Sequence, residues 1–186
     1  MDVEEFKKYI RSQSPASIAE ELLMKPTVHA LSCENEYQAY KQIIKAEHPN
    51  SFHIAVVGSG GWKFSLNPYN NLREFRDKSD IDIAVICAES FLNTWDAMRD
   101  HHRNNYYSLN NDSRTALKRA GENVYAGFIT PKWINSRSSA VRREYDKRTN
   151  NYSNSAVKFK AVNMMYFRNM DETIDYYVRG IRIAAR

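Results

Sequence analysis

Two short apolar runs constrain the fold of this 186-residue chain more than any other feature of its sequence. Residues 52–57 and 81–86 are each too short for a stable helix and are rich in β-branched side chains, so we interpret both as strands. The segments around them carry apolar residues at helical spacing. The sequence therefore predicts an α/β protein of the α+β kind, in which helices surround a sheet.

The length suits one domain, and the first 50 residues predict a helical part that precedes both runs. One helix is expected over residues 3–10. A second is expected to begin at Ser14-Pro15, because serine caps a helix and proline fits its first position. Ser32 is the expected cap of a third. We therefore expect a single domain over residues 1–186, with a helical addition followed by a core over residues 51–186.

Beyond the second run, predicted helices and strands alternate. One helix is expected over residues 89–103 and another over residues 111–120, with Gly121 as its C-terminal stop. The later assignments follow from apolar spacing and composition: a strand over 124–130, a polar loop over 135–156 with a short helix near 138–147, a long strand over 156–168, and a final helix over 170–185.

Composition narrows the class of protein. Hydrophobic residues make up 42% of the chain and charged residues 26%, which suits a folded globular protein and argues against disorder. No apolar run approaches the roughly 18 residues of a membrane helix, and the first residues lack the apolar stretch of a signal peptide. Cys33 and Cys87 are too few for a disulfide framework. We expect a cytoplasmic protein with no membrane partner.

The net charge of +5 is unevenly distributed along the chain. Residues 1–98 carry 10 basic and 14 acidic side chains, a net of −4, whereas residues 99–186 carry 17 and 8, a net of +9. Over residues 125–152, aromatic side chains interleave with lysines and arginines, a mixture typical of surfaces that bind single-stranded nucleic acid. A nucleotide or RNA partner is one interpretation, and a solvated basic surface is the other.

Asp80 and Asp82 are the strongest candidates for chemistry. They lie two residues apart at the second strand, so their side chains point to one face about 7 Å apart, while Ile81 and Ile83 point into a core. Paired carboxylates suit Mg²⁺ or Mn²⁺, hard cations that also bind nucleotide phosphates. The first strand runs into residues 58–61, Gly-Ser-Gly-Gly, whose backbone N–H groups are accessible to a phosphate.

The segment Val57-Gly58-Ser59, a spacer and Asp80-Ile81-Asp82-Ile83 resemble the nucleotidyltransferase superfamily of the DNA polymerase β type, over roughly residues 52–87. The resemblance implies a nucleotidyltransferase-like mixed sheet flanked by helices. It implies that Asp80 and Asp82 bind the metal ion and carry the catalysis. The expected nucleotide-binding residues are Gly58, Ser59, Gly60, Lys63 and Ser79.

Members of this superfamily move a nucleoside monophosphate from an NTP to a hydroxyl group of RNA, protein or a small molecule, using Mg²⁺ or Mn²⁺. The chain looks most like the small stand-alone members of prokaryotes, which include toxin–antitoxin and phage-defence components. There the acceptor is often tRNA or a protein. The resemblance therefore implies an NTP substrate, an RNA or protein acceptor and an antitoxin-like partner protein.

Two features depart from the pattern of the superfamily. Twenty residues separate Ser59 from Asp80, so an inserted loop is expected at the mouth of the site, where its cations either bind phosphates or are simply solvated. The superfamily also carries a third carboxylate on a later strand. The strand predicted over residues 156–168 contains no acid and offers Lys158 and Lys160 instead.

Glu122, just before the strand predicted over residues 124–130, is the leading substitute for that third acid. If Lys158 or Lys160 faces the aspartates, a lysine replaces the charge of one metal ion. The sequence thus leaves two hypotheses open. One is a metal-dependent nucleotidyltransferase. The other is a catalytically inactive module of the same fold that binds nucleotide, RNA or a partner protein.

Overall fold

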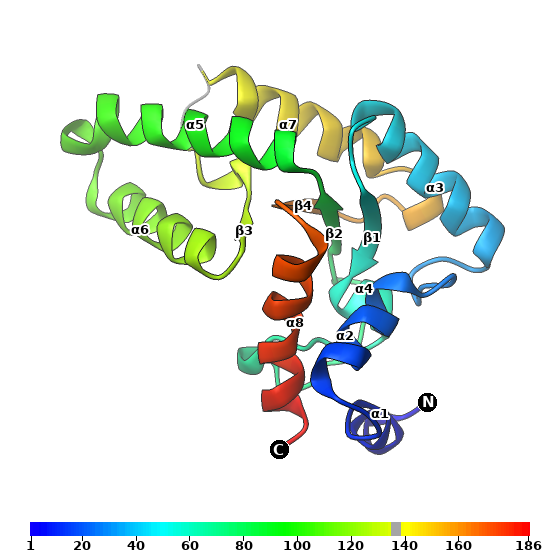
Figure 1. Cartoon of the computed structure of the whole chain (residues 1–186). Coiled ribbons are helices and arrows are strands. Elements are labelled where there is room, and N and C mark those ends of the chain that lie inside the picture. The colour runs from blue at the N-terminus through cyan, green and yellow to red at the C-terminus, as the bar shows by residue number, and fades with distance from the viewer. Residues whose placement is uncertain (135–138) are drawn as a thin grey trace.

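The computed structural model describes residues 1–134 and 139–186. Its strands are β1 (His53–Val57), β2 (Ile81–Ile86), β3 (Phe128–Ile129) and β4 (Val162–Phe167). They form one four-stranded mixed sheet in the order β1-β2-β4-β3 (Figure 1). The central strand β2 is antiparallel to β1 and parallel to β4, and β3 is antiparallel to β4.

Helices cover both faces of the sheet (Figure 1). One core is closed by α3 (Glu34–Glu47), α5 (Ala88–Asn105), α6 (Asn111–Tyr125) and α7 (Ala140–Tyr152). The other is closed by α1 (Val3–Ile10), α2 (Pro15–Met24), α4 (Gly58–Trp62) and α8 (Met170–Ala184). The 3₁₀ turns are η1 (Pro68–Asn70), η2 (Tyr106–Ser108), η3 (Pro131–Trp133) and η4 (Ser155–Val157).

Alternating side chains of β2 separate the two cores. Ile81 and Ile83 lie in the core beneath α3, α5 and α7, as predicted. Ala84 and Ile86 lie in the core beneath α1, α2 and α8. Because Asp82 alternates with Ile81 and Ile83, it faces the same side as Ala84. The aspartate therefore lies under α8, on a face that is also covered.

The predicted helical N-terminal part is confirmed. Asp2 caps α1 and forms a reciprocal capping box with Glu5, and the Ser14 hydroxyl accepts from the backbone N–H of Ser17 at 3.1 Å. The prediction for Ser32 is wrong, because α3 begins one residue later, with Cys33 at the cap position. Of these helices, α1 and α2 pack against α8 on one face of the sheet, whereas α3 packs against β1 and closes the core on the other face.

The strand predicted over residues 124–130 is mostly helix. Val124 continues the apolar stripe of Leu117 and Ala120 at helical spacing, so α6 runs through to Tyr125 and leaves only β3 as strand. Gly121 does not stop α6. A Cβ at this glycine would meet nothing within 4 Å, so the position is open and the helix tolerates it.

The long strand predicted over residues 156–168 is shorter and begins later. Lys158 and Phe159 adopt left-handed backbone conformations, with φ of +53° and +54°, which no strand accommodates. Strand β4 therefore starts at Val162, and Lys158 and Lys160 lie in the turn that precedes it. The residue that β4 places beside Asp82 is Asn163, since these two residues are paired in the parallel register.

The basic and aromatic stretch over residues 125–152 differs from its prediction. It contains α7, which is longer than the expected short helix, while residues 135–138 lie outside the described residues. Tyr145 and Tyr152 are buried in the core, so their rings are not available to stack on bases. Arg142 forms an ion pair with Asp146 at 2.9 Å. The stretch is largely a structural part of the sheet's helical cover.

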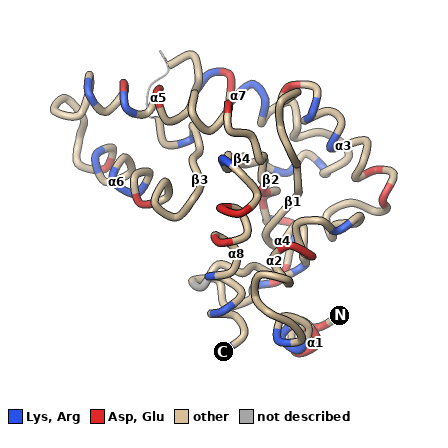
Figure 2. The backbone as a smooth tube through the Cα atoms, in the orientation of Figure 1, with Lys and Arg blue, Asp and Glu red and all other residues tan. Residues whose placement is uncertain are grey.

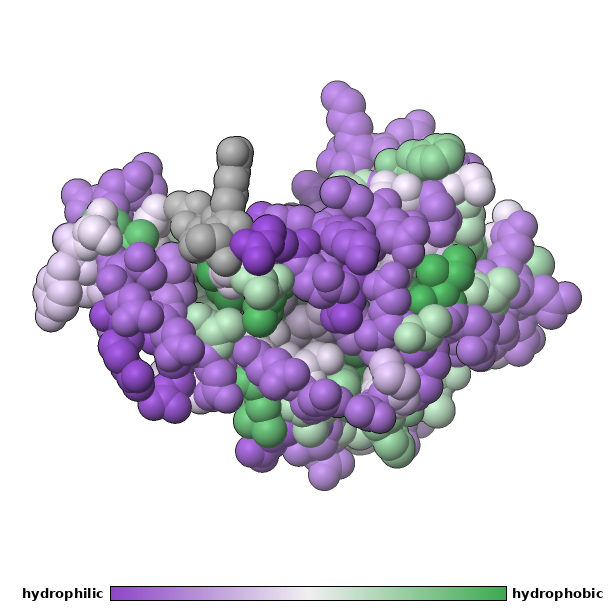
Figure 3. All heavy atoms as spheres, turned by 90° about the horizontal axis from the view of Figure 1, so that it is seen from above, coloured by the Kyte–Doolittle hydropathy of each residue, from purple (hydrophilic) through white to green (hydrophobic). Residues whose placement is uncertain are grey.

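Charges of both signs occur on single helices, as on α1 and α6 in Figure 2, so the uneven charge along the chain does not divide the fold into an acidic and a basic half. The face seen in Figure 3 is mostly hydrophilic, with separate small hydrophobic patches. Within the described residues, every helix is too short or too polar to cross a bilayer.

Candidate functional site

Three polar side chains meet where β2 begins. The Nδ2 group of Asn163 donates to Asp80 Oδ2 at 2.6 Å and to Asp82 Oδ1 at 3.2 Å. Both aspartates thus face one amide nitrogen, which confirms that they share a face. Asp80 is exposed and precedes the strand, whereas Asp82 is half-buried within it. Parallel pairing of β2 with β4 produces this arrangement, because it sets Asn163 directly beside Asp82.

Lys132 completes this polar cluster. It belongs to η3, and its Nζ donates to the Asn163 Oδ1 at 2.8 Å. The amide of Asn163 therefore accepts from a cation on one side and donates to two carboxylates on the other. This chain of hydrogen bonds holds the side chains of Asp80 and Asp82 in a fixed relation to each other.

Burial and charge repulsion act together on Asp82. Burial raises the pKa of its carboxyl group to about 6, with a second contribution from the charge of Asp80. The hydrogen bond from Asn163 and the positive charge of Lys132 oppose the increase. Burial and the charge of Asp80 thus destabilise the charged form of this carboxylate, so a bound cation would stabilise it.

Gly58 connects the aspartates to α4. Residues 58–61, expected to form a turn, instead begin this short helix directly after β1. Gly58 has a φ of +62°, and a Cβ there would lie 3.1 Å from Asp82 Oδ2. Both the backbone conformation and the close approach require glycine. The first N–H groups of a helix have no partner within it, and α4 begins at Gly58, next to Asp82.

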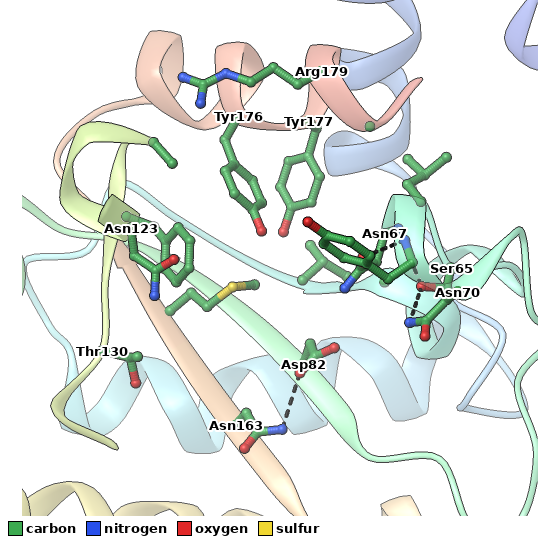
Figure 4. Close-up of a pocket in the computed structure, with 18 of the residues that line it drawn as sticks. Ser65, Asn67, Asn70, Asp82, Asn123, Thr130, Asn163, Tyr176, Tyr177 and Arg179 are labelled. Carbon is green, nitrogen blue, oxygen red and sulfur yellow. Dashed lines mark hydrogen bonds between the residues drawn. The ribbon is translucent and has the colours of Figure 1, made fainter. Parts of the chain in front are cut away.

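A cavity of about 580 Å³ opens above Asp82, under α8; we call it the α8 cavity. Its walls come from β2, β4, α6, α8 and the inserted loop. In Figure 4 the hydroxyl groups of Tyr176 and Tyr177 point from α8 toward the cavity, and Asp82 and Asn163 lie on its opposite side. Its further polar lining residues are Ser65, Asn67, Asn70, Asn123, Thr130, Lys132 and Arg179.

Tyr177 is the most unusual group of the α8 cavity. Its side chain is 6% exposed, and among the described residues its hydroxyl has no hydrogen-bond partner. Burial raises the pKa of this hydroxyl well above its usual value, with smaller contributions from Tyr176 and Asp82, so it stays protonated and acts as a donor. Buried hydroxyl groups are normally satisfied, so this unpartnered donor at the wall of the α8 cavity is exceptional.

A second cavity of about 530 Å³ lies beside Asp80, and we call it the basic cavity. It shares no lining residue with the α8 cavity, which reaches Asp82 instead. The aspartate pair therefore borders both. The residues that line the basic cavity are Arg73, Arg76, Asp77, Lys78, Ser79, Asp80, Lys160 and Ala161.

The inserted loop, here defined as residues 63–79, is anchored rather than free. Phe64 is buried against Phe6, with ring centroids 5.1 Å apart, and Leu66 packs on α8 where Gly180 leaves room. A Cβ at Gly180 would lie 2.8 Å from the Leu66 carbonyl oxygen. The loop lines both cavities, as expected for an insertion at the mouth of the site.

Several residues predicted for the site lie elsewhere. Lys63 forms an ion pair with Glu74 at 3.1 Å and donates to the Met1 carbonyl oxygen, so its charge is already compensated. Glu122 is exposed on α6 and lines neither cavity, which makes it a wrong choice for the third acid. Lys158 is exposed in the turn before β4.

The glycine-rich segment and its neighbours are divided between the two cavities. Of the glycine-rich residues, Gly58 alone lines the α8 cavity, while Ser59 and Gly60 lie deeper in α4. Ser79 and Lys160 line the basic cavity. The Ser79 hydroxyl accepts from the backbone N–H of Arg76 at 2.9 Å, so it stabilises the loop.

Sequence reasoning missed Asn163, Lys132 and the two tyrosines of α8. Asn163 is the polar residue within the apolar run of β4, and that signal was present in the sequence. Tyr176 and Tyr177 were indistinguishable from core tyrosines, because only the packing of α8 over β2 directs their hydroxyl groups toward Asp82.

Comparisons with protein-family models, curated proteins and solved structures each found no match. Within residues 1–134 and 139–186, no group of three or more His, Cys, Asp and Glu side chains is placed to hold a metal ion. Asp80 and Asp82 are thus two carboxylates accompanied by the amide of Asn163.

Proposed function

We propose that the chain is a nucleotidyltransferase of the DNA polymerase β type that moves a nucleoside monophosphate from an NTP to a hydroxyl acceptor. One observation carries the proposal. Gly58 directly after β1, the two aspartates at the start of β2 and Asn163 of β4 lie together, and Gly58, Asp82 and Asn163 line the α8 cavity. The close approach of Gly58 to Asp82 supports the proposal, because an Asp-x-Asp sequence that occurs by chance would not place a glycine against its second aspartate.

The donor set suits a hard divalent cation. Asp80 and Asp82 supply carboxylate oxygens, and the raised pKa of Asp82 marks a buried charge that lacks sufficient compensation. Rotation of the Asn163 amide would add a neutral oxygen ligand. When bound, Mg²⁺ or Mn²⁺ would neutralise the charge that develops on the phosphates and on the leaving group.

The residues of the α8 cavity have separate roles in this proposal. The backbone N–H groups at the start of α4 orient the triphosphate beside Asp82. Tyr176 and Tyr177 donate to the nucleoside part of the substrate. The aromatic and amide side chains of the cavity offer the mixture of apolar and hydrogen-bonding surface that a base and ribose require.

In the reaction, the acceptor oxygen forms a bond to the α-phosphorus. The bond from the α-phosphorus to the oxygen that bridges to the β-phosphate breaks, and pyrophosphate leaves with that electron pair. The proton of the acceptor hydroxyl passes to an aspartate carboxylate or to water. Asp80 and Asp82 therefore have the double task of holding the cation and of orienting the acceptor.

The test measures nucleotide binding and transfer separately. Calorimetry with each NTP and Mn²⁺ is compared between the wild type, Asp80→Ala, Asp82→Ala, the double variant Asp80→Ala/Asp82→Ala and Glu122→Ala. Each protein is also incubated with α-³²P-labelled NTPs and total RNA or protein. We expect all aspartate variants to lose binding and label transfer, and Glu122→Ala, which removes an exposed acid elsewhere, to retain both. Equal label transfer by the wild type and the double aspartate variant would overturn the proposal.

A second candidate function is a catalytically inactive nucleotide-binding module of the same fold. The specific observation in its favour is Asn163, an amide rather than an acid on the strand beside the aspartates, which already donates to both of them, while Lys132 adds a positive charge. This candidate predicts nucleotide binding without label transfer to any acceptor. The same calorimetry and labelling experiment separates the two.

A further inference from the structure

We propose that the basic cavity binds the phosphodiester backbone of a single-stranded nucleic acid, with Phe159 stacking on one of its bases. The inference deepens the proposed function, because it assigns the acceptor to nucleic acid rather than protein. The binding itself stands on separate residues. They border the aspartate pair at Asp80, whereas the α8 cavity reaches it at Asp82, and the two cavities share no lining residue.

The basic cavity has an excess of positive charge, which supports phosphate binding. Arg73, Arg76, Lys78 and Lys160 line it, and none of them forms an ion pair with a described carboxylate. The only acids in the lining are Asp77 and Asp80, and Asp80 is engaged by Asn163. A concave surface with an excess of positive charge attracts phosphates and raises their local concentration.

The cavity also has a defined frame. Lys160 Nζ donates to the carbonyl oxygen of Asp77 at 2.6 Å and to that of Arg76 at 3.3 Å. It also lies over the ring of Phe75, 5.1 Å from the centroid. Lys160 thereby ties the turn before β4 to the inserted loop. The arginines and Lys78 are presented from a segment of fixed backbone, so they can contact adjacent phosphates of one strand.

The exposed ring of Phe159 also supports the proposal, and this support does not depend on charge. Its ring is 72% exposed, although it directly precedes Lys160 at the cavity. Lys158 and Phe159 adopt left-handed conformations in the turn that precedes β4. Exposed aromatic rings next to cations are the usual means of binding unpaired bases, since every base has a face that stacks. A double helix would not offer that face, so the cavity favours a single strand.

The position of the cavity separates the acceptor from the NTP. Gly58 and the tyrosines of α8 belong to the α8 cavity, where the proposed function places the NTP. The basic cavity reaches the aspartates from Asp80. A strand bound through its phosphates in the basic cavity would therefore present a hydroxyl to the aspartates at Asp80, while the nucleotide reaches them at Asp82.

The test is fluorescence anisotropy of a labelled 12-nucleotide oligouridylate, in EDTA and without NTP, so that binding is measured independently of the metal site. The triple variant Arg73→Ala/Arg76→Ala/Lys78→Ala is compared with a control of equal charge change on α5 and α6, Arg103→Ala/Lys118→Ala/Arg119→Ala. We expect the cavity triple variant to bind the oligonucleotide at least about ten-fold more weakly, and the slope of log affinity against log salt concentration to decrease by about two. The control triple variant should change the affinity less than about three-fold.

Phe159 is tested by two substitutions. Phe159→Ala is expected to weaken binding at least about five-fold with an unchanged salt slope, and Phe159→Tyr to restore it, because stacking needs a ring and not a charge. Circular dichroism checks that each variant is folded. Equal losses in the cavity and control triples, or wild-type binding by the cavity triple, would overturn the proposal.

Two further outcomes identify a different ligand. Loss of ATP binding rather than oligonucleotide binding in the cavity triple would assign the cavity to the triphosphate. Equally tight binding of polyglutamate would assign it to acidic protein. Failure of the proposed function is visible separately, as an aspartate double variant that still transfers label while oligonucleotide binding responds as expected.

Discussion

Asn163 of β4 lies directly beside Asp82 of β2 and donates to both carboxylates of the Asp80–Asp82 pair. One amide nitrogen thus occupies the place where a cation would be shared. The hydrogen bonds lower the repulsion between two acids that the strand forces together. In this structure a neutral amide therefore stabilises the aspartate pair.

Replacing this amide with an acid should strengthen cation binding. We expect Asn163→Asp to bind Mn²⁺ at least about ten-fold more tightly and to unfold at a lower temperature without Mn²⁺, because three carboxylates then repel one another. Calorimetry and thermal denaturation with and without Mn²⁺ measure both effects. Asn123→Asp, which adds a charge to the α8 cavity from α6, is the control. Unchanged Mn²⁺ affinity in Asn163→Asp would exclude a cation site at Asp82.

Asp82 should make stability depend on pH in the absence of cations. Its pKa is about 6 in the folded protein against a reference value of 3.8, so the folded state holds the proton more tightly. The contribution of Asp82 to the free energy of unfolding is therefore present below pH 4 and is lost as the pH rises to 6. This loss amounts to roughly 2–3 kcal/mol at most. Chemical denaturation at several pH values should show this decline in the wild type and not in Asp82→Asn. Identical pH profiles would contradict the burial of this charge.

Gly58→Ala should lower both stability and nucleotide affinity. The substitution places a side chain in a left-handed conformation and sets its Cβ 3.1 Å from Asp82 Oδ2, at an expected cost of about 1–2 kcal/mol. Gly121→Ala is the matched control, because its Cβ meets nothing within 4 Å and alanine favours the helix by about 0.5–1 kcal/mol. Urea denaturation measures both free energies, and a Gly58→Ala protein as stable as the wild type would contradict the predicted contact.

Tyr177→Phe should reduce nucleotide affinity without reducing stability. Its buried hydroxyl has no partner among the described residues, so its removal relieves a desolvated polar group. Tyr37→Phe provides the contrast, since the Tyr37 hydroxyl accepts from the Val56 backbone N–H at 3.1 Å in the core. We expect Tyr37→Phe to cost about 1–2 kcal/mol and Tyr177→Phe to cost nothing. NTP calorimetry then shows whether Tyr177 contacts the ligand, and wild-type affinity would exclude that contact.

Local patterns in the sequence predicted most of the elements. The runs at residues 52–57 and 81–86, the Ser14-Pro15 helix start and the opposite faces of Ile83 and Asp82 depend on neighbouring residues, and the structure confirms each. The strand predicted over residues 124–130 was wrong because this one apolar run contributes to both a helix and a strand. Val124 belongs to a helix and Phe128 to a strand, although both lie in one short run.

The sequence by itself determined the glycine-rich segment, the aspartate pair and the insertion between them, because each is set by spacing along the chain. Only the tertiary structure decided what completes the site. The left-handed turn at Lys158 moves the start of β4, and the parallel pairing of β4 with β2 then sets Asn163, rather than a lysine, beside Asp82. That choice depends on register between segments about 80 residues apart, which no local pattern encodes.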